Sequence, residues 1–148
     1  MVLSVFLLGC FFIFVSDIKY RKIPNVLLVG LFILRLTSII VNFDSILLMD
    51  SVFGLLFAFF VFILPKFMKM KLGWGDVKYS TVLGFSLGFV DYICSMLLSV
   101  IFVFIYCAVR KVLLKKDIKD FSLPIGSFMS AGVIFLCVME FILQTSHL

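Results

Sequence analysis

Two aspartates stand at the edges of apolar segments, where a carboxylate is unusual. Asp17 follows the first apolar run in the segment SDIK (16–19), and Asp76 closes the segment GWGD (73–76). Ionisable side chains at such places are rare and often mark functional sites. If the fold brings these two carboxylates together in a medium of low dielectric, they cannot both ionise. The pair then holds one proton near neutral pH.

A carboxylate pair that shares one proton can activate water. The charged member takes a proton from the water while the neutral member protonates a substrate carbonyl, as in aspartic proteases. This chemistry requires neither a metal nor a cofactor. Gly73 and Gly75 lack side chains and would let a peptide backbone approach Asp76 closely. The alternative is a structural role without catalysis, in which both aspartates are helix caps or solvated boundary residues. The triplet Asp-x-Lys also occurs at 117–119, so this triplet alone does not indicate an active site.

The composition predicts which elements must position these residues. The chain has 148 residues, of which 64% are apolar and 14% charged, with a mean hydropathy of +1.31. Soluble domains are nearer half apolar and a quarter charged, so a soluble globular protein is excluded. We expect one all-α membrane domain over 1–148 with six transmembrane helices, at about 25 residues per span and loop. The apolar runs lie at about 1–16, 26–41, 46–64, 79–90, 92–109 and 121–143.

The distribution of positive charge predicts the topology. Of the 13 Lys and Arg residues, twelve fall in the connections 17–25, 65–78 and 110–120. The other connections, near 42–45 and Asp91, and the tail from 144 carry none. Basic loops remain in the cytoplasm, so both termini should lie outside an inner (cytoplasmic) membrane, with three basic cytoplasmic loops. Asp17 and Asp76 then share the cytoplasmic boundary, and the net charge of +5 does not indicate a nucleic-acid partner.

Two further ionisable residues lie within apolar runs. Arg35 is alone in the second run, and Asp50 lies about one turn into the third, near the same outer surface. We expect a structural ion pair or snorkelling, with a part in the site or a proton path as the alternative. The four cysteines form no CxxC and have no histidine nearby, so no metal site is predicted.

Three motifs together resemble the type IV prepilin peptidases, which are membrane aspartyl proteases of the Gly-x-Gly-Asp kind. These are Asp17 followed by IPN (23–25), the segment GWGDVK (73–78), and the segment LPIGS (123–127). The resemblance implies an aspartic endopeptidase with Asp17 and Asp76 as the catalytic pair. Gly73, Gly75 and Lys78 would shape the site or bind substrate. It also implies that the partners are membrane lipid and a prepilin or pseudopilin, whose basic leader is removed on the cytoplasmic side.

The chain departs from that family in two respects. It has no CxxC motif and is similar to the short form of the family, so methylation of the new pilin N-terminus is not predicted. The third motif usually reads Pro-Phe-Gly-Pro, and Ile125 and Ser127 replace its Phe and second Pro. This change bears on substrate fit more than on catalysis. The pattern predicts no particular oligomeric state.

Two other functions are compatible with the same residues. One is a non-enzymatic transport or assembly subunit whose charges serve packing or proton relay. The other is a pseudo-peptidase that binds leaders without cutting them. Replacing either aspartate by Asn separates these readings, because only a peptidase loses turnover while it still folds normally.

Overall fold

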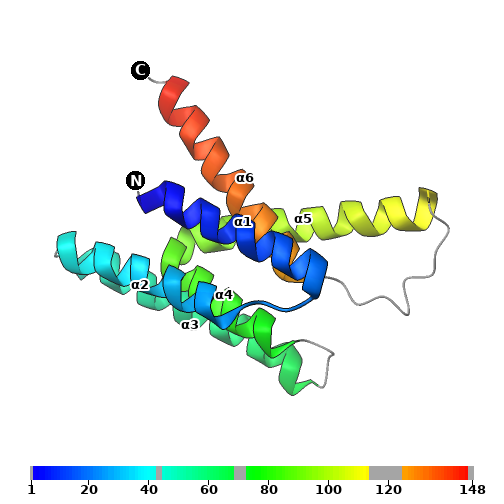
Figure 1. Ribbon diagram of the computed structural model, residues 1–148, viewed down its shortest axis with the longest axis horizontal. Coiled ribbons are helices and arrows are strands. Elements are labelled where there is room, and N and C mark those ends of the chain that lie inside the picture. Colours follow the sequence, from blue (N-terminus) through cyan, green and yellow to red (C-terminus); the bar gives the residue numbers. More distant parts are fainter. Residues whose placement is uncertain (1, 43–44, 69–72, 114–124, 147–148) are drawn as a thin grey trace.

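The protein is a bundle of six α-helices, seen in a computed structural model that describes residues 2–42, 45–68, 73–113 and 125–146 (Figure 1). The helices are α1 (Val2–Tyr20), α2 (Asn25–Asn42), α3 (Ser45–Phe67), α4 (Trp74–Leu87), α5 (Phe89–Leu113) and α6 (Ile125–Ser146). The predicted all-α class and the expected number of helices are therefore confirmed for the described residues. Most of the basic connection 110–120, with Leu123 and Pro124 of the third motif, lies outside them.

Within the described residues, four helices are long and apolar enough to cross a membrane. They comprise α2, α3, residues 89–111 of α5 and residues 125–143 of α6. The chain is therefore a multi-pass membrane protein. Helix α4 has only 14 residues. At a rise of about 1.5 Å per residue it is about 21 Å long, whereas the hydrocarbon core of a membrane is about 30 Å thick. That all six helices cross, and in which orientation, stays a prediction.

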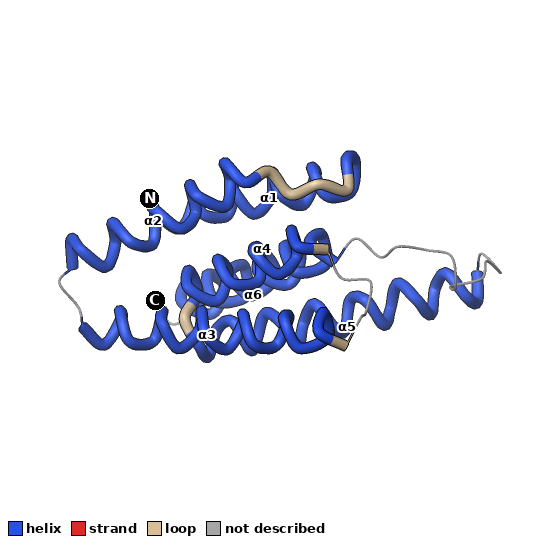
Figure 2. Tube along the Cα trace, turned by 90° about the horizontal axis from the view of Figure 1, so that it is seen from below, coloured by secondary structure: helices blue, strands red, loops and turns tan. Residues whose placement is uncertain are grey.

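The arrangement of the helices brings distant segments of the chain together. Helix α4 packs along α3 and α2, while α6 packs along α5 and α1. Figure 2 shows α4 and α6 between α1 and α2 on one side and α3 and α5 on the other. The C-terminal end of α1 and the N-terminal ends of α4 and α6 consequently meet at one end of the bundle.

Small residues allow α3 and α4 to touch backbone to backbone. A Cβ atom added at Gly84 would overlap the carbonyl oxygen of Gly54 and lie 2.7 Å from the Cβ of Ala58. Gly54 and Ala58 are one helical turn apart, which is the small-xxx-small spacing that permits close helix approach in membranes. This contact fixes α4, and with it the Asp76 at its start, against α3.

The boundary between the fourth and fifth helices differs from the one expected near Asp91. The turn lies at Gly88, whose φ of +90° falls in a region that side-chain-bearing residues rarely adopt. The apolar residues on either side of Gly88 concealed this turn. Asp50 from α3 stabilises the turn at Gly88, because its Oδ1 accepts a hydrogen bond from the backbone N–H of Phe89 at 3.1 Å.

Arg35 and Asp50 form no direct ion pair within the described part of the chain, so that part of the expectation is wrong. Snorkelling of Arg35 and a part in the site or a proton path stay predictions. Among the described residues, Arg35 instead donates from Nε to the Ser51 hydroxyl at 3.1 Å. Asp50 is engaged at the start of α5, where its carboxylate satisfies an amide that has no partner within the helix.

The close contact of α3 and α4 can be tested with a larger side chain. We expect Gly84→Val to lower the midpoint of thermal unfolding in detergent by several degrees, because overpacking costs about 1–3 kcal/mol. Gly30→Val is the matched control, since a Cβ at Gly30 meets nothing within 4 Å. Equal midpoints for the two variants would contradict the backbone contact.

Candidate active site

Asp17 is a buried carboxylate at the end of α1. Its side chain is 5% exposed, and its Oδ2 accepts two hydrogen bonds from one residue of α6. The backbone N–H of Ser127 donates at 2.7 Å and the Ser127 hydroxyl donates at 2.8 Å. A buried charge is stable only when it is compensated in this way. The start of α6 therefore supplies two hydrogen-bond donors to the Asp17 carboxylate.

The start of α6 also contacts the second aspartate. The backbone of Gly126 lies close enough to the carboxyl group of Asp76 to lower the pKa of that group. The first amides of a helix have no partner within it, and the helix dipole places positive potential there. The amide of Ser127 thus holds Asp17, and the neighbouring backbone of Gly126 acts on Asp76. Asp17 and Asp76 lie close together, as the sequence predicted from their shared depth.

Asp76 differs from Asp17 in its electrostatic surroundings. It is half-buried in the first turn of α4, and its pKa is raised to about 6. The main cause is loss of hydration on burial, followed by the negative charge of Asp17. Hydrogen bonds from the backbone of Gly73 and Gly126 and the charge of Lys66 oppose this rise. Asp76 is therefore the member of the pair that can hold a proton near neutral pH.

Glycines around the carboxylates have different structural roles. A Cβ at Gly126 would lie 3.0 Å from Oδ2 of Asp17 and 2.9 Å from Cδ1 of Ile23. A Cβ at Gly73 would lie 3.0 Å from Oδ2 of Asp76. Packing within the protein thus favours glycine at both positions. At Gly75 a Cβ would make only ordinary contacts, 3.8 Å from Ile23, so internal packing does not require glycine there.

A second set of hydrogen bonds joins α4 to α6 beneath the aspartates. The hydroxyls of Tyr79 and Ser130 are 2.7 Å apart, and Ser130 donates to the carbonyl of Gly126 at 2.9 Å. Tyr79 and Ser130 are fully buried. Such bonds link helices in membranes, and here they fix the start of α6 relative to α4. Sequence reasoning did not select Ser127, Ser130 or Tyr79 as site residues. The two serines are three residues apart, and this spacing places both on one face at the start of a helix.

Lys78 lines a groove on the outer surface of α4. It is exposed, and this apolar groove lies between α2, α3 and α4, with Asn25 and Trp74 also in its wall. The cation that acts on Asp76 is Lys66, which sequence reasoning did not select; its Nζ lies 3.8 Å from the centre of the Trp74 ring. In the part of the chain that the structure describes, no cluster of three or more His, Cys, Asp or Glu side chains could hold a metal ion.

Comparison with known proteins identifies the family. A family model described as the type IV leader peptidase family matches residues 4–108. The chain belongs to this family. No curated protein and no solved structure matches the chain. The matched region of this leader peptidase family member contains Asp17, Gly73, Gly75 and Asp76 but ends before α6. The contacts of Gly126 and Ser127 are therefore a finding of the structure.

The raised pKa of Asp76 makes stability depend on pH. Between the ordinary pKa of 3.8 and about 6, the folded protein binds more protons than the unfolded chain. The stabilisation from the neutral carboxyl is present at low pH and is lost as the pH rises through 6. We expect Asp76→Asn, which stays neutral, to unfold at a higher temperature than the wild type at pH 7. The difference should shrink at pH 4.5, and equal midpoints at both pH values would contradict the raised pKa.

Proposed function

We propose that this protein is an aspartic endopeptidase that removes the basic leader from type IV prepilins or pseudopilins. The observation that carries the proposal is the pair of carboxylates at the start of α6: Asp17 is held by the amide of Ser127, and Asp76 beside it has a pKa of about 6. A structural cap would need one carboxylate at a helix start. Two carboxylates in one place repel each other, and proteins accept that cost where the shared proton has a use.

The surroundings of the two carboxylates support a different role for each in this proposal. Asp17, which accepts two hydrogen bonds from Ser127, is the charged base that takes a proton from water. Asp76 is the neutral acid that gives its proton to the oxygen of the scissile carbonyl. The water oxygen then adds to the carbonyl carbon to form a tetrahedral intermediate. Asp17 gives its newly gained proton to the leaving nitrogen, the C–N bond breaks, and a hydroxyl of the intermediate returns a proton to Asp76 as the carboxylic acid product forms. The absence of a side chain at Gly75 leaves room for the substrate backbone beside Asp76.

An apolar groove beside the pair supports a substrate with an apolar segment. A cavity of about 630 Å³ lies between α1, α5 and α6 and reaches Ser127, the residue bonded to Asp17. Aromatic and aliphatic side chains form most of its wall, including Phe14, Phe102 and Phe128. The apolar helix that follows a prepilin leader would lie there. The leader would then extend toward the cytoplasm, where the basic connections are predicted.

The proposal is tested with a cleavage assay on purified protein in liposomes. The substrate is a prepilin-like peptide with a basic leader, a Gly at the junction and an apolar helix. We expect Asp17→Asn and Asp76→Asn each to lose at least about 10²–10⁴-fold in turnover while they still fold, because each removes a general acid or base. Asp117→Asn is the control, since it alters the other Asp-x-Lys triplet. Normal cleavage by either site variant would refute the proposal and favour a transport or assembly subunit.

Ser127 provides a finer test of the assigned roles. Ser127→Ala removes the hydroxyl donor but keeps the backbone donor to Asp17. A hydrogen bond to a charged group contributes about 1.5–3 kcal/mol, so we expect kcat to fall about tenfold or more with little change in KM. Ser127→Thr, which keeps a hydroxyl, should restore most of the activity. If alanine and threonine variants behave alike, Ser127 does not act through its hydroxyl.

A further inference from the structure

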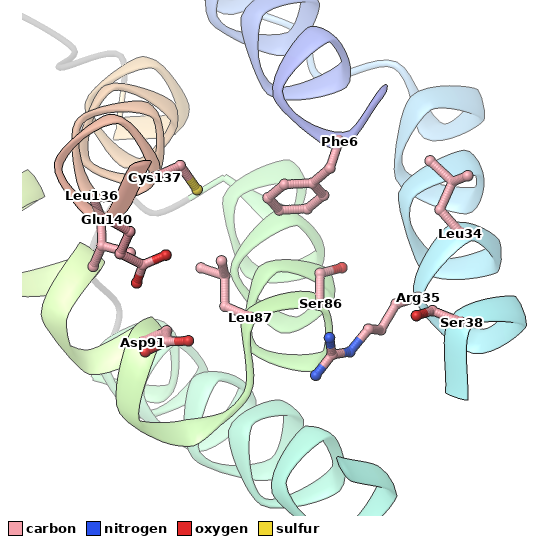
Figure 3. A pocket seen from close by; sticks show the side chains of 10 residues that line it. All are labelled: Phe6, Leu34, Arg35, Ser38, Ser86, Leu87, Asp91, Leu136, Cys137 and Glu140. Carbon is pink, nitrogen blue, oxygen red and sulfur yellow. The ribbon is translucent and has the colours of Figure 1, made fainter. Parts of the chain in front are cut away.

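A second polar site lies at the end of the bundle opposite the two aspartates. Five polar side chains line a cavity of about 190 Å³ between α1, α2, α4, α5 and α6 (Figure 3). They are Arg35, Ser38, Ser86, Asp91 and Glu140. The rest of the wall is largely apolar. Neither the family match nor the proposed peptidase chemistry accounts for this cluster.

Several of these polar groups have no partner within the described part of the chain. Ser86 is 8% exposed, and its buried hydroxyl has no hydrogen-bond partner among the described residues. Half-buried Arg35 uses only Nε, toward Ser51, so both terminal NH₂ groups remain available. The carboxylates of Asp91 and Glu140 are exposed and form no hydrogen bond to a described residue. An unsatisfied buried hydroxyl beside a half-buried guanidinium is costly within a membrane protein, which indicates that the cavity accommodates a polar ligand.

The charges in the cavity are separated into two groups. In Figure 3, Asp91 and Glu140 lie together on one side, while Arg35 and Ser38 lie on the other, with Ser86 and Leu87 between them. Two neighbouring carboxylates are best relieved by a shared cation that can donate several hydrogen bonds. The planar guanidinium of Arg35 suits phosphate oxygens, which it can bind with two parallel hydrogen bonds. A ligand that satisfies both groups carries a primary ammonium and a phosphate.

The size and depth of the cavity restrict this ligand further. Its volume of about 190 Å³ is the scale of a small head group, since a water molecule occupies about 30 Å³ in the liquid. Arg35 lies seven residues before the end of α2, and Glu140 lies six before the end of α6. At a rise of about 1.5 Å per residue these positions are about 9–11 Å from the helix ends, near the boundary between hydrocarbon and head groups. The apolar side chains Phe6, Leu34 and Leu136 at the same cavity could contact the first part of an acyl chain.

We propose that this cavity is a binding site for a phosphoethanolamine group. The phosphate binds Arg35 with Ser38 and Ser86, and the ammonium binds Asp91 and Glu140. A phosphocholine group fits less well, because its quaternary ammonium is larger and has no N–H donor for the carboxylates. Phosphatidylglycerol brings a phosphate but no cation. The source of the group is a phospholipid or free phosphoethanolamine, and the two are distinguished by experiment.

The test measures lipid binding to the purified full chain in detergent by native mass spectrometry. Dioleoylphosphatidylethanolamine should bind at least about tenfold more tightly than the phosphatidylcholine and phosphatidylglycerol with the same acyl chains. Arg35→Gln and Glu140→Gln should each abolish this preference, and Ser86→Ala should reduce it. Thr37→Ala, on α2 outside the cavity, is the matched control and should retain it. Using the ratio of lipids bound to each variant keeps the result independent of differences in stability.

A second arm adds free O-phosphoethanolamine to the same samples. Competition with the lipid in the wild type but not in Arg35→Gln supports the site and shows that the head group alone is sufficient. Binding of free phosphoethanolamine without any lipid preference assigns the site to the soluble compound. Equal binding of all three lipids together with no effect of free phosphoethanolamine would overturn the proposal. An unchanged preference in both Arg35→Gln and Glu140→Gln would also overturn it.

Discussion

Two consecutive backbone amides at the start of α6 face two carboxylates that are far apart in the sequence. The N–H of Ser127 donates to Asp17 from α1, and the backbone of Gly126 lies close enough to Asp76 from α4 to lower the pKa of its carboxyl group. These amides have no partner within their own helix, and the helix dipole adds positive potential at the same place. The start of α6 therefore offsets part of the repulsion that would otherwise separate the two carboxylates. Three helices depend on this one constraint for their relative position.

The rest of the bundle maintains that arrangement. The contact of Gly54 with Gly84 holds α4 against α3, and the hydrogen bonds of Ser130 hold α6 against Tyr79 of α4. Both contacts depend on small side chains, because bulkier ones would prevent the close approach of the backbones. The bundle thus combines two features: an apolar surface compatible with lipid, and a buried polar seam that ends at the carboxylates. A pKa of about 6 at Asp76 follows from this burial and from the neighbouring charge of Asp17.

The sequence was informative about the class of protein and the principal residues. Composition predicted the six helices, and the positions of Asp17 and Asp76 relative to the apolar runs predicted that they would meet.

The sequence was less informative where a single backbone angle or a distant contact decides the structure. The turn at Gly88 lies within apolar residues, so hydropathy did not reveal it. Ser127 looked like a departure from a family motif, and only the approach of α1 to α6 shows it as a donor to Asp17. Asp50 was expected to pair with Arg35, but its carboxylate instead accepts a hydrogen bond from the amide of Phe89 at the start of α5.

The most direct measurement concerns the coupling of the two aspartates. The side-chain carboxyl ¹³C resonance of Asp76 would be followed against pH in the wild type and in Asp17→Asn, and assigned from its disappearance in Asp76→Asn. Because the charge of Asp17 is one cause of the raised pKa of Asp76, its removal should lower that pKa from about 6. It should stay above the ordinary value of 3.8, since burial remains the larger cause. An Asp76 titration that is unchanged by Asp17→Asn in folded protein would show that the carboxylates do not form a coupled pair.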